Sequence, residues 1–209
     1  MMQEPLLTLI RFDLILESIS GVIALMISHQ ANTAYRLTEQ KRLSDLSTGF
    51  LVLSASMFGR VIGSLYFFVI AAGGSIPDAD MMQNVVSMAY GFLKIMAFVL
   101  FAVSTRRGGG GQMPSEAAFM ALPFLIDPNL ELIAILVLLI VVMQALMNYA
   151  AIRTRFALYV LAGFLFLLLS LIFGIFATMN ISAYGVSQAF QFLGLMSFLV
   201  MLLKSGREQ

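Results

Sequence analysis

The 209-residue sequence contains no cysteine, no tryptophan and only one histidine. Without cysteine the chain can form neither a disulfide, nor a thiolate zinc site, nor an iron–sulfur cluster. A single histidine cannot supply both axial ligands of a bis-histidine haem. We therefore expect the protein to hold no cofactor and no metal ion.

Charged residues are scarce as well. Asp, Glu, Lys and Arg make up 11% of the chain, whereas soluble domains contain about 25%. Hydrophobic residues make up 60%, and the mean hydropathy is +0.95. Because this composition suits lipid rather than water, we predict an all-α polytopic membrane protein with the lipid bilayer around it. The net charge is +1 and no basic run exceeds two residues, so we expect no nucleic-acid partner.

The first apolar run lacks the features of a removable signal peptide. Glu4 makes the leading segment acidic, and neither a basic n-region nor a small-residue cleavage site is present. We therefore expect the first helix to be retained, with a charged connector at 36–45 after it. A transmembrane helix needs about 20 apolar residues. Six runs meet this length, namely about 6–35, 46–72, 82–105, 130–151, 155–179 and 183–204.

A seventh, shorter run covers residues 114–127 and is stopped by Asp127-Pro128. At about 1.5 Å per residue, about 14 helical residues reach only about 21 Å, which is short of a hydrocarbon core of about 30 Å. If this run nevertheless crosses the bilayer, the two triplets of long helices have the same orientation. The predicted units are then a first three-helix repeat, a glycine joint with a short helix, and a second three-helix repeat, at 1–107, 108–128 and 129–209.

The distribution of basic loop residues favours seven crossings, because cytoplasmic loops collect Lys and Arg. Six crossings would divide these residues between the two sides of the membrane. Seven crossings place them all on one side, namely Arg36, Lys41, Arg42, Arg106, Arg107, Arg153, Arg155, Lys204 and Arg207. The other side then has only acidic loop residues, Glu4, Asp78, Asp80 and Asp127. We therefore predict seven transmembrane helices in the plasma membrane, with the N-terminus outside and the C-terminus inside.

An internal repeat supports the same plan. Residues 89–98, AYGFLKIMAF, match residues 189–198, AFQFLGLMSF, at five positions. Further matches pair Gly49-Phe50 with Gly163-Phe164, and Ala24-Leu25-Met26 with Ala145-Leu146-Met147. Two copies in the same orientation, joined by one crossing segment, form a parallel 3+1+3 arrangement.

Three ionisable residues, Glu17, Arg60 and Lys94, lie well inside apolar runs. A charge at the centre of a bilayer costs about 3 kcal/mol on insertion scales, so each should have a partner. All three lie at a similar depth, and Asp13 is one turn from Glu17 on the same helix face. We predict that these four residues form an intramembrane polar cluster. An interhelical salt-bridge cluster is the first interpretation, a ligand or ion site the second, and a proton relay the third.

The second copy has no charge at the matching positions, where Gly174 and Gly194 stand opposite Arg60 and Lys94. A site built by one half and faced by plain helices of the other is a common layout in transporters and receptors. The asymmetry therefore favours a functional cluster, although drift after duplication would leave the same pattern.

Other features predict no chemistry. His29 lies in a polar stretch, where a hydrogen-bonded interfacial histidine is a better interpretation than a metal ligand. Met143 and Met147 lie one turn apart, but without Cys or further His they indicate packing rather than a Cu(I) site. The glycines of 108–111 lack the GK[ST] of a phosphate loop. No Ser–His–Asp set and no HExxH is present, so we do not expect an enzyme.

The segment AYRLTEQKRLSDLSTGF (34–50) places a basic connector before the second helix. Together with the N-out seven-helix plan, it resembles the small seven-helix membrane modules that precede some histidine kinases and occur free-standing in archaea. The resemblance covers most of the chain and implies a role in signal input. The 3+1+3 plan also resembles SWEET sugar transporters, whose Pro-Gln motif is missing here. Microbial rhodopsins share the topology, but the last run has no mid-membrane lysine for retinal, which excludes them.

These features predict a non-enzymatic membrane module. It would act as a sensory, signal-input bundle or as an accessory, scaffold subunit of a membrane complex. Its expected partners are the bilayer and either a second membrane protein or another copy of this chain. The alternative is a small secondary transporter with its polar site between the first three helices.

Overall fold

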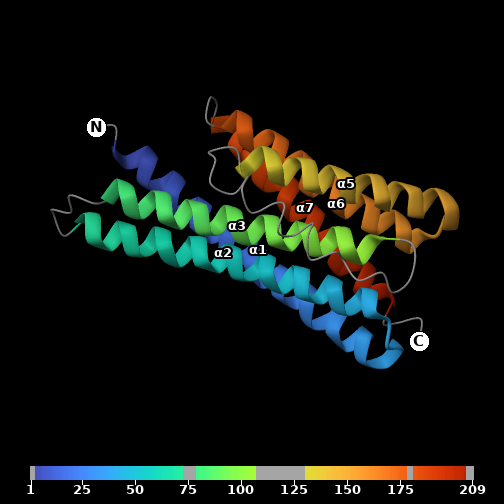
Figure 1. Cartoon of the computed structure of the whole chain (residues 1–209). Coiled ribbons are helices and arrows are strands. Elements are labelled where there is room, and N and C mark those ends of the chain that lie inside the picture. The colour runs from blue at the N-terminus through green and yellow to red at the C-terminus, as the bar shows by residue number, and fades with distance from the viewer. Residues whose placement is uncertain (1–2, 73–78, 107–129, 178–180, 206–209) are drawn as a thin grey trace.

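The computed structural model describes residues 3–72, 79–106, 130–177 and 181–205, with side chains described over 14–66, 84–106, 130–176 and 182–204. Within these ranges the chain forms α-helices and no strand. The helices are α1 (Gln3–Thr38), α2 (Lys41–Ala72), α3 (Ala79–Thr105), α5 (Leu130–Ile152), α6 (Arg155–Ala177) and α7 (Ile181–Ser205) (Figure 1).

Each of the six described helices is long and apolar enough to cross a membrane. This confirms the six long runs expected from the sequence and indicates a membrane-embedded, multi-pass protein. Large apolar side chains such as Leu136, Ile140 and Met143 are exposed on the outside of the bundle, as a lipid-facing surface requires. The seventh expected helix, at 114–127, lies outside the described residues.

One connector is shorter than the sequence suggested. The charged stretch 36–45 was expected to link the first two helices, but α1 continues to Thr38 and α2 begins at Lys41. Glu39 ends α1 because it adopts a left-handed φ of 54° and its amide donates a hydrogen bond of 2.7 Å to the carbonyl of Tyr35. The charged residues therefore lie mostly on the ends of two helices joined by a tight turn.

Helix α5 ends in the same way, at the turn between α5 and α6. Arg153 has a φ of 50°, and its amide donates to the carbonyl of Tyr149 at 2.8 Å. Glu39 and Arg153 are 114 residues apart, which is also the separation of Gly49 and Gly163 in the sequence match. The two turns thus give a common register for α1–α2 and α5–α6, which we call the cap register.

The described helices form a ring in which each packs against the next, in the order α1, α2, α3, α5, α6, α7 and back to α1. Helices α3 and α5 run in the same direction. Leu130, the first residue of α5, lies beside Gly91, which is midway along α3. Further along both helices, Thr105 donates to Gln144 at 2.7 Å, and Asn148 donates to the Thr105 carbonyl at 2.8 Å. Leu130 consequently lies about 20 Å along the bundle from Arg106, away from the end at which α3 stops.

The α1–α2 turn, the α5–α6 turn and the C-terminal ends of α3 and α7 all lie at one end of the bundle, on the right in Figure 1. We call this end the basic end. It carries the described basic residues that flank helices, namely Arg36, Lys41, Arg42, Arg106, Arg153, Arg155 and Lys204.

Four phenylalanines fill the centre of the bundle, and all four are fully buried. We call Phe50, Phe101, Phe164 and Phe198 the aromatic quartet. Ring centroids are 4.7 Å apart for Phe50–Phe101 and for Phe164–Phe198, and 5.0 and 5.4 Å apart for the two contacts that join these pairs. Tilted and edge-to-face contacts at such distances are favourable for aromatic rings. The quartet therefore ties the first three helices to the last three.

A glycine lies beneath one ring in each half. A Cβ at Gly49 would lie 2.5 Å from the Phe101 ring, and a Cβ at Gly163 would meet the Phe198 ring at least as closely. Only glycine leaves room for rings in these places. The sequence match aligned Phe98 with Phe198, whereas the ring that packs on Gly49 is that of Phe101, one helical turn further along α3.

Candidate functional site

Glu17 is the centre of the candidate site. Its side chain lies between α1, α2 and α3, and the residue is only 1% exposed. Arg60 of α2 donates from Nη1 to Glu17 Oε2 at 3.1 Å. The structure thus brings Glu17 and Arg60 together, as expected. Small residues such as Gly21 lie where α1 packs on α2. Burial strengthens their attraction because little water screens it.

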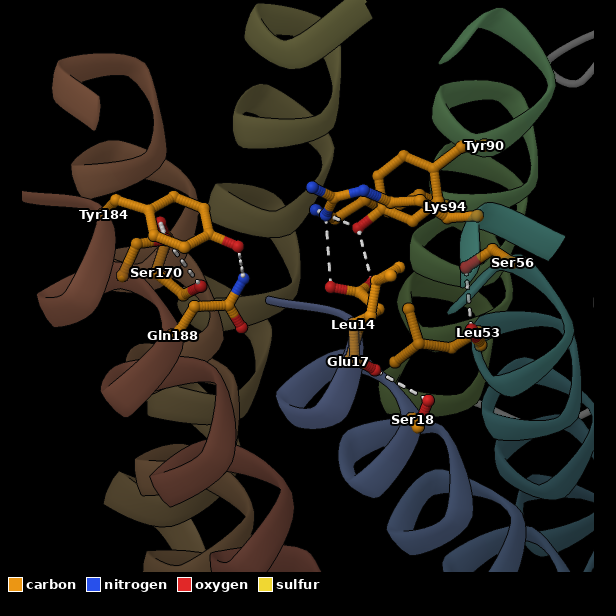
Figure 2. Close-up of polar contacts among 12 residues, drawn as sticks. Leu14, Glu17, Ser18, Leu53, Ser56, Tyr90, Lys94, Ser170, Tyr184 and Gln188 are labelled. Atoms are coloured by element: carbon orange, nitrogen blue, oxygen red, sulfur yellow. Dashed lines mark hydrogen bonds and ion pairs between the residues drawn. The ribbon is translucent and has the colours of Figure 1, made fainter. Parts of the chain in front are cut away.

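Tyr90 of α3 completes the contacts of the carboxylate. Its hydroxyl donates to Glu17 Oε1 at 3.3 Å, and Lys94 donates from Nζ to the same hydroxyl at 3.2 Å (Figure 2). The guanidinium of Arg60 and the ammonium of Lys94 also lie 5.2 and 5.0 Å from the centre of the Tyr90 ring. Cations at these distances are attracted to the face of an aromatic ring. Tyr90 therefore links both cations to the acid.

The structure brings together Glu17, Arg60 and Lys94, as the sequence predicted. Lys94 reaches Tyr90 rather than a carboxylate among the described side chains. The side chain of Asp13 lies outside the part of the chain whose side chains are described, so its expected place in the cluster is not addressed. Tyr90 was missed by sequence reasoning, although its spacing of four residues from Lys94 places both on one face of α3.

The cluster carries two cations and one anion among these described residues. Glu17 is almost completely enclosed, but the Arg60 side chain is 31% exposed and Lys94 is partly buried. An added anionic or polar group would meet the cluster from this cationic side. The geometry is that of an ion pair whose acid is enclosed and whose cationic side is partly exposed.

A second set of polar side chains lies on α7, the helix that packs on the other side of α1. Gln188 is buried and donates from Nε2 to the Tyr184 hydroxyl at 2.9 Å. In Figure 2 the Tyr184 hydroxyl and the Gln188 amide point from α7 toward the side on which Glu17 lies. Gln191 follows on the same face of α7 and is 6% exposed, and its Nε2 has no hydrogen-bond acceptor in the described part of the chain.

These groups support binding more directly than bond-making chemistry. Guanidinium, ammonium, phenol and amide groups recognise carboxylates, phosphates and other polar ligands. No group of three His, Cys, Asp or Glu residues that could hold a metal ion occurs among the described side chains.

No protein-family model matches the chain, and neither a curated protein nor a solved structure matches it.

Proposed function

We propose that this chain is a non-enzymatic membrane module of the plasma membrane that senses a small polar ligand at the Glu17–Arg60–Tyr90–Lys94 cluster. It passes the signal to a membrane partner, as a signal-input bundle or as an accessory subunit. The observation that carries the proposal is the partial exposure of Arg60 beside an otherwise enclosed ion pair. A guanidinium has several N–H donors, so an exposed one can donate to an added anion while it keeps its bond to Glu17.

The aromatic quartet supports sensing over conduction. Phe50 precedes Arg60 by ten residues on α2, so the quartet lies about 15 Å from the cluster, toward the basic end. All four rings are fully buried and touch one another. A ligand that enters at the cluster therefore meets a closed aromatic layer. The binding free energy of the ligand can shift the helices, but the ligand has no open path through this layer.

The proposal includes seven transmembrane helices, with the N-terminus outside, the C-terminus inside and two parallel three-helix repeats. It is supported by the common direction of α3 and α5, with Leu130, where α5 begins, about 20 Å along the bundle from Arg106. The gathering of basic residues at one end supports a cytoplasmic location for that end.

Cysteine labelling tests this topology, because the chain has no native cysteine. Cysteines at Gln40 and Thr154 should label only from inside, and cysteines at Asp80 and Glu131 only from outside. Labelling of Gln40 and Thr154 from opposite sides would rule out the parallel arrangement.

Ligand binding itself is tested with the purified full-length chain. Thermal-shift measurements over small carboxylates, phosphates and amines should find an anion that raises the melting temperature of wild type. Arg60→Gln should abolish the shift, whereas Arg155→Gln, at the basic end, should leave it intact. Shifts of equal size in both variants would remove the cluster as the ligand site.

A small secondary transporter is the second candidate. It is favoured by the matching helix caps at Glu39 and Arg153 and by the glycine–ring contacts in both halves, because paired structural units can rock against each other in transport. Uptake by proteoliposomes separates the candidates. Accumulation of the ligand that stops in Arg60→Gln would establish transport, and ligand binding without accumulation would support the sensing module.

A further inference from the structure

A groove of about 680 Å³ lies on the outside of the bundle between α1 and α2, close to the basic end. Buried Ser28 and Ser47 form its floor, and they hold the two helices together. Ser28 Oγ donates to the Ser47 carbonyl at 2.8 Å, and Ser47 Oγ donates to the Ser28 carbonyl at 2.9 Å. The groove is distinct from the charged cluster, which lies further from the basic end.

The polarity of the groove changes along its length. Its deep part is apolar and is lined by Leu25, Met26 and Leu51, each 45–49% exposed. The part nearer the basic end is lined by the polar side chains of His29, Gln30, Asn32 and Thr48. An amphiphile in the adjacent leaflet has the same order, with its acyl chains deep and its head group at the interface.

Basic residues extend the groove toward the end of the bundle. Arg36 follows Leu25, His29 and Asn32 at helical spacing on α1, and Lys41 precedes Thr48 by two turns on α2. Both are exposed. The acidic residues nearest in the sequence are Glu39, in the turn, and Asp45, one turn after Lys41 on α2. Arg36 is therefore the charge most nearly in line with the groove.

We propose that this groove binds one anionic phospholipid of the leaflet at the basic end. The amide and imidazole groups of Gln30, Asn32 and His29 can donate to phosphate oxygens, and Arg36 with Lys41 supplies the preference for negative charge. The acyl chains lie along Leu25, Met26 and Leu51. The volume is within the range of specific ligand sites.

The second half offers a comparison. In the cap register, Leu25 corresponds to Leu139 rather than to Leu146 of the sequence match, and Leu25 and Leu139 are 45% and 44% exposed. Four polar groups of the groove and its extension have apolar counterparts on α5 and α6: His29, Asn32, Arg36 and Thr48 correspond to Met143, Leu146, Ala150 and Ala162. Two do not, because Gln30 corresponds to Gln144 and Lys41 to Arg155. General contact with lipid needs only the apolar surface that both halves possess. The polar part of the groove, which only the first half has in full, indicates binding of a particular lipid head group.

Native mass spectrometry of the delipidated full-length protein tests the proposal with phosphatidylglycerol and phosphatidylcholine as probes. Wild type should bind one phosphatidylglycerol more tightly than any further lipid. Arg36→Gln should weaken this step about fivefold, the factor for one basic residue near an anionic head group, and Arg155→Gln should leave it unchanged. Leu25→Trp fills the groove and should abolish the step, while Leu139→Trp should retain it.

Circular dichroism melts check that each variant is folded, and Met26→Trp replaces Leu25→Trp if the latter is not. Equal lipid retention by the groove and control variants would overturn the site. Equal binding of the two lipids would overturn the anionic preference. Displacement by sn-glycerol 3-phosphate would show a phosphate site rather than a lipid site. A wild-type dimer that Leu25→Trp converts to a monomer without lipid loss would show that a second copy occupies the groove.

Discussion

The first three helices hold an ion pair between the buried Glu17 and the partly exposed Arg60, whereas the interior of the last three contains no charged residue. In the last three helices the described interior polar contacts are neutral, between Ser170 and Ser187 and between Tyr184 and Gln188. Yet both halves share the same cap at their first turn and the same glycine beneath an aromatic ring.

The caps and glycine–ring contacts are common to both halves, whereas the charged residues are present only in the interior of the first half. The shared caps and glycine–ring contacts occur in the last three helices without a charged residue in their interior. A charged group in a membrane interior is costly to place, and Glu17, Arg60 and Lys94 all lie in the first half. The contrast supports the proposed ligand site, in which these charges have a use beyond packing.

The largest expected effect concerns the ion pair. Arg60→Ala leaves the buried Glu17 carboxylate without its cation, and Glu17→Ala leaves Arg60 without its acid. Arg60→Ala should destabilise the protein by up to roughly 3–5 kcal/mol, the range for a broken buried pair in soluble proteins, or somewhat less in a membrane. Glu17→Ala should cost less, because the Arg60 side chain that it leaves is 31% exposed. The double variant should lose less than the sum, because neither charge is left alone. Unfolding in mixed micelles measures all three.

The neutral half supplies the control for that cycle. Gln188→Leu removes the contact with Tyr184 without leaving a charge, and it should cost about 1 kcal/mol. If the Glu17 and Arg60 changes are additive within about 0.5 kcal/mol, the two residues are not coupled. The contrast between the halves would then fail.

Substitution of the two glycines that pack against phenylalanine rings should cost the two halves similar amounts of stability. Gly49→Ala and Gly163→Ala each force a methyl group against a buried phenylalanine and should destabilise by about 1–3 kcal/mol. Gly59→Ala is the matched control, since a Cβ there meets nothing within 4 Å, and it should be neutral or stabilising by up to about 1 kcal/mol. Melting temperatures in detergent compare the three. A large loss at only one of the two sites would show that the halves pack differently.

Lys94→Met should have a smaller effect on stability than Arg60→Ala. The ammonium donates to the Tyr90 hydroxyl and lies over its ring, and such contacts are worth about 1 kcal/mol. The variant should keep its fold and lose the ligand-induced shift in melting temperature. A loss of stability as large as that of Arg60→Ala would mean that Lys94 pairs directly with Glu17.

The smallest effects are expected at the serine contacts between neighbouring helices. Ser47→Ala removes a bond from α2 to α1, and Ser187→Ala removes one from α7 to α6. Hydrogen bonds between transmembrane helices average about 0.6 kcal/mol, so both losses should be close to this value. Unfolding free energies that differ by more than about 1 kcal/mol would break the equivalence of the two contacts.

The sequence predicted the six long helices because each apolar run exceeds the length of a membrane span. It predicted the Glu17–Arg60 pair because isolated charges in such runs need partners. Tyr90 was missed since tyrosine is common in membrane helices, and its role depends on which face of α3 meets α1. The short α1–α2 turn was missed because the charges of 36–45 suggested a loop, whereas the left-handed residue Glu39 needs only one amide–carbonyl contact to end the helix. The groove between α1 and α2 depends on side chains from two helices and has no signal in either alone.

The gathering of positive charge at one end of the bundle bears on how the chain is inserted during synthesis. Arg36, Lys41, Arg42 and Arg106 flank the first three helices at that end, and Arg153, Arg155 and Lys204 flank the last three. In the proposed topology this end is cytoplasmic, so each half carries its own orientation signal and the two signals agree. The direction of the later helices then does not depend on the first helix alone.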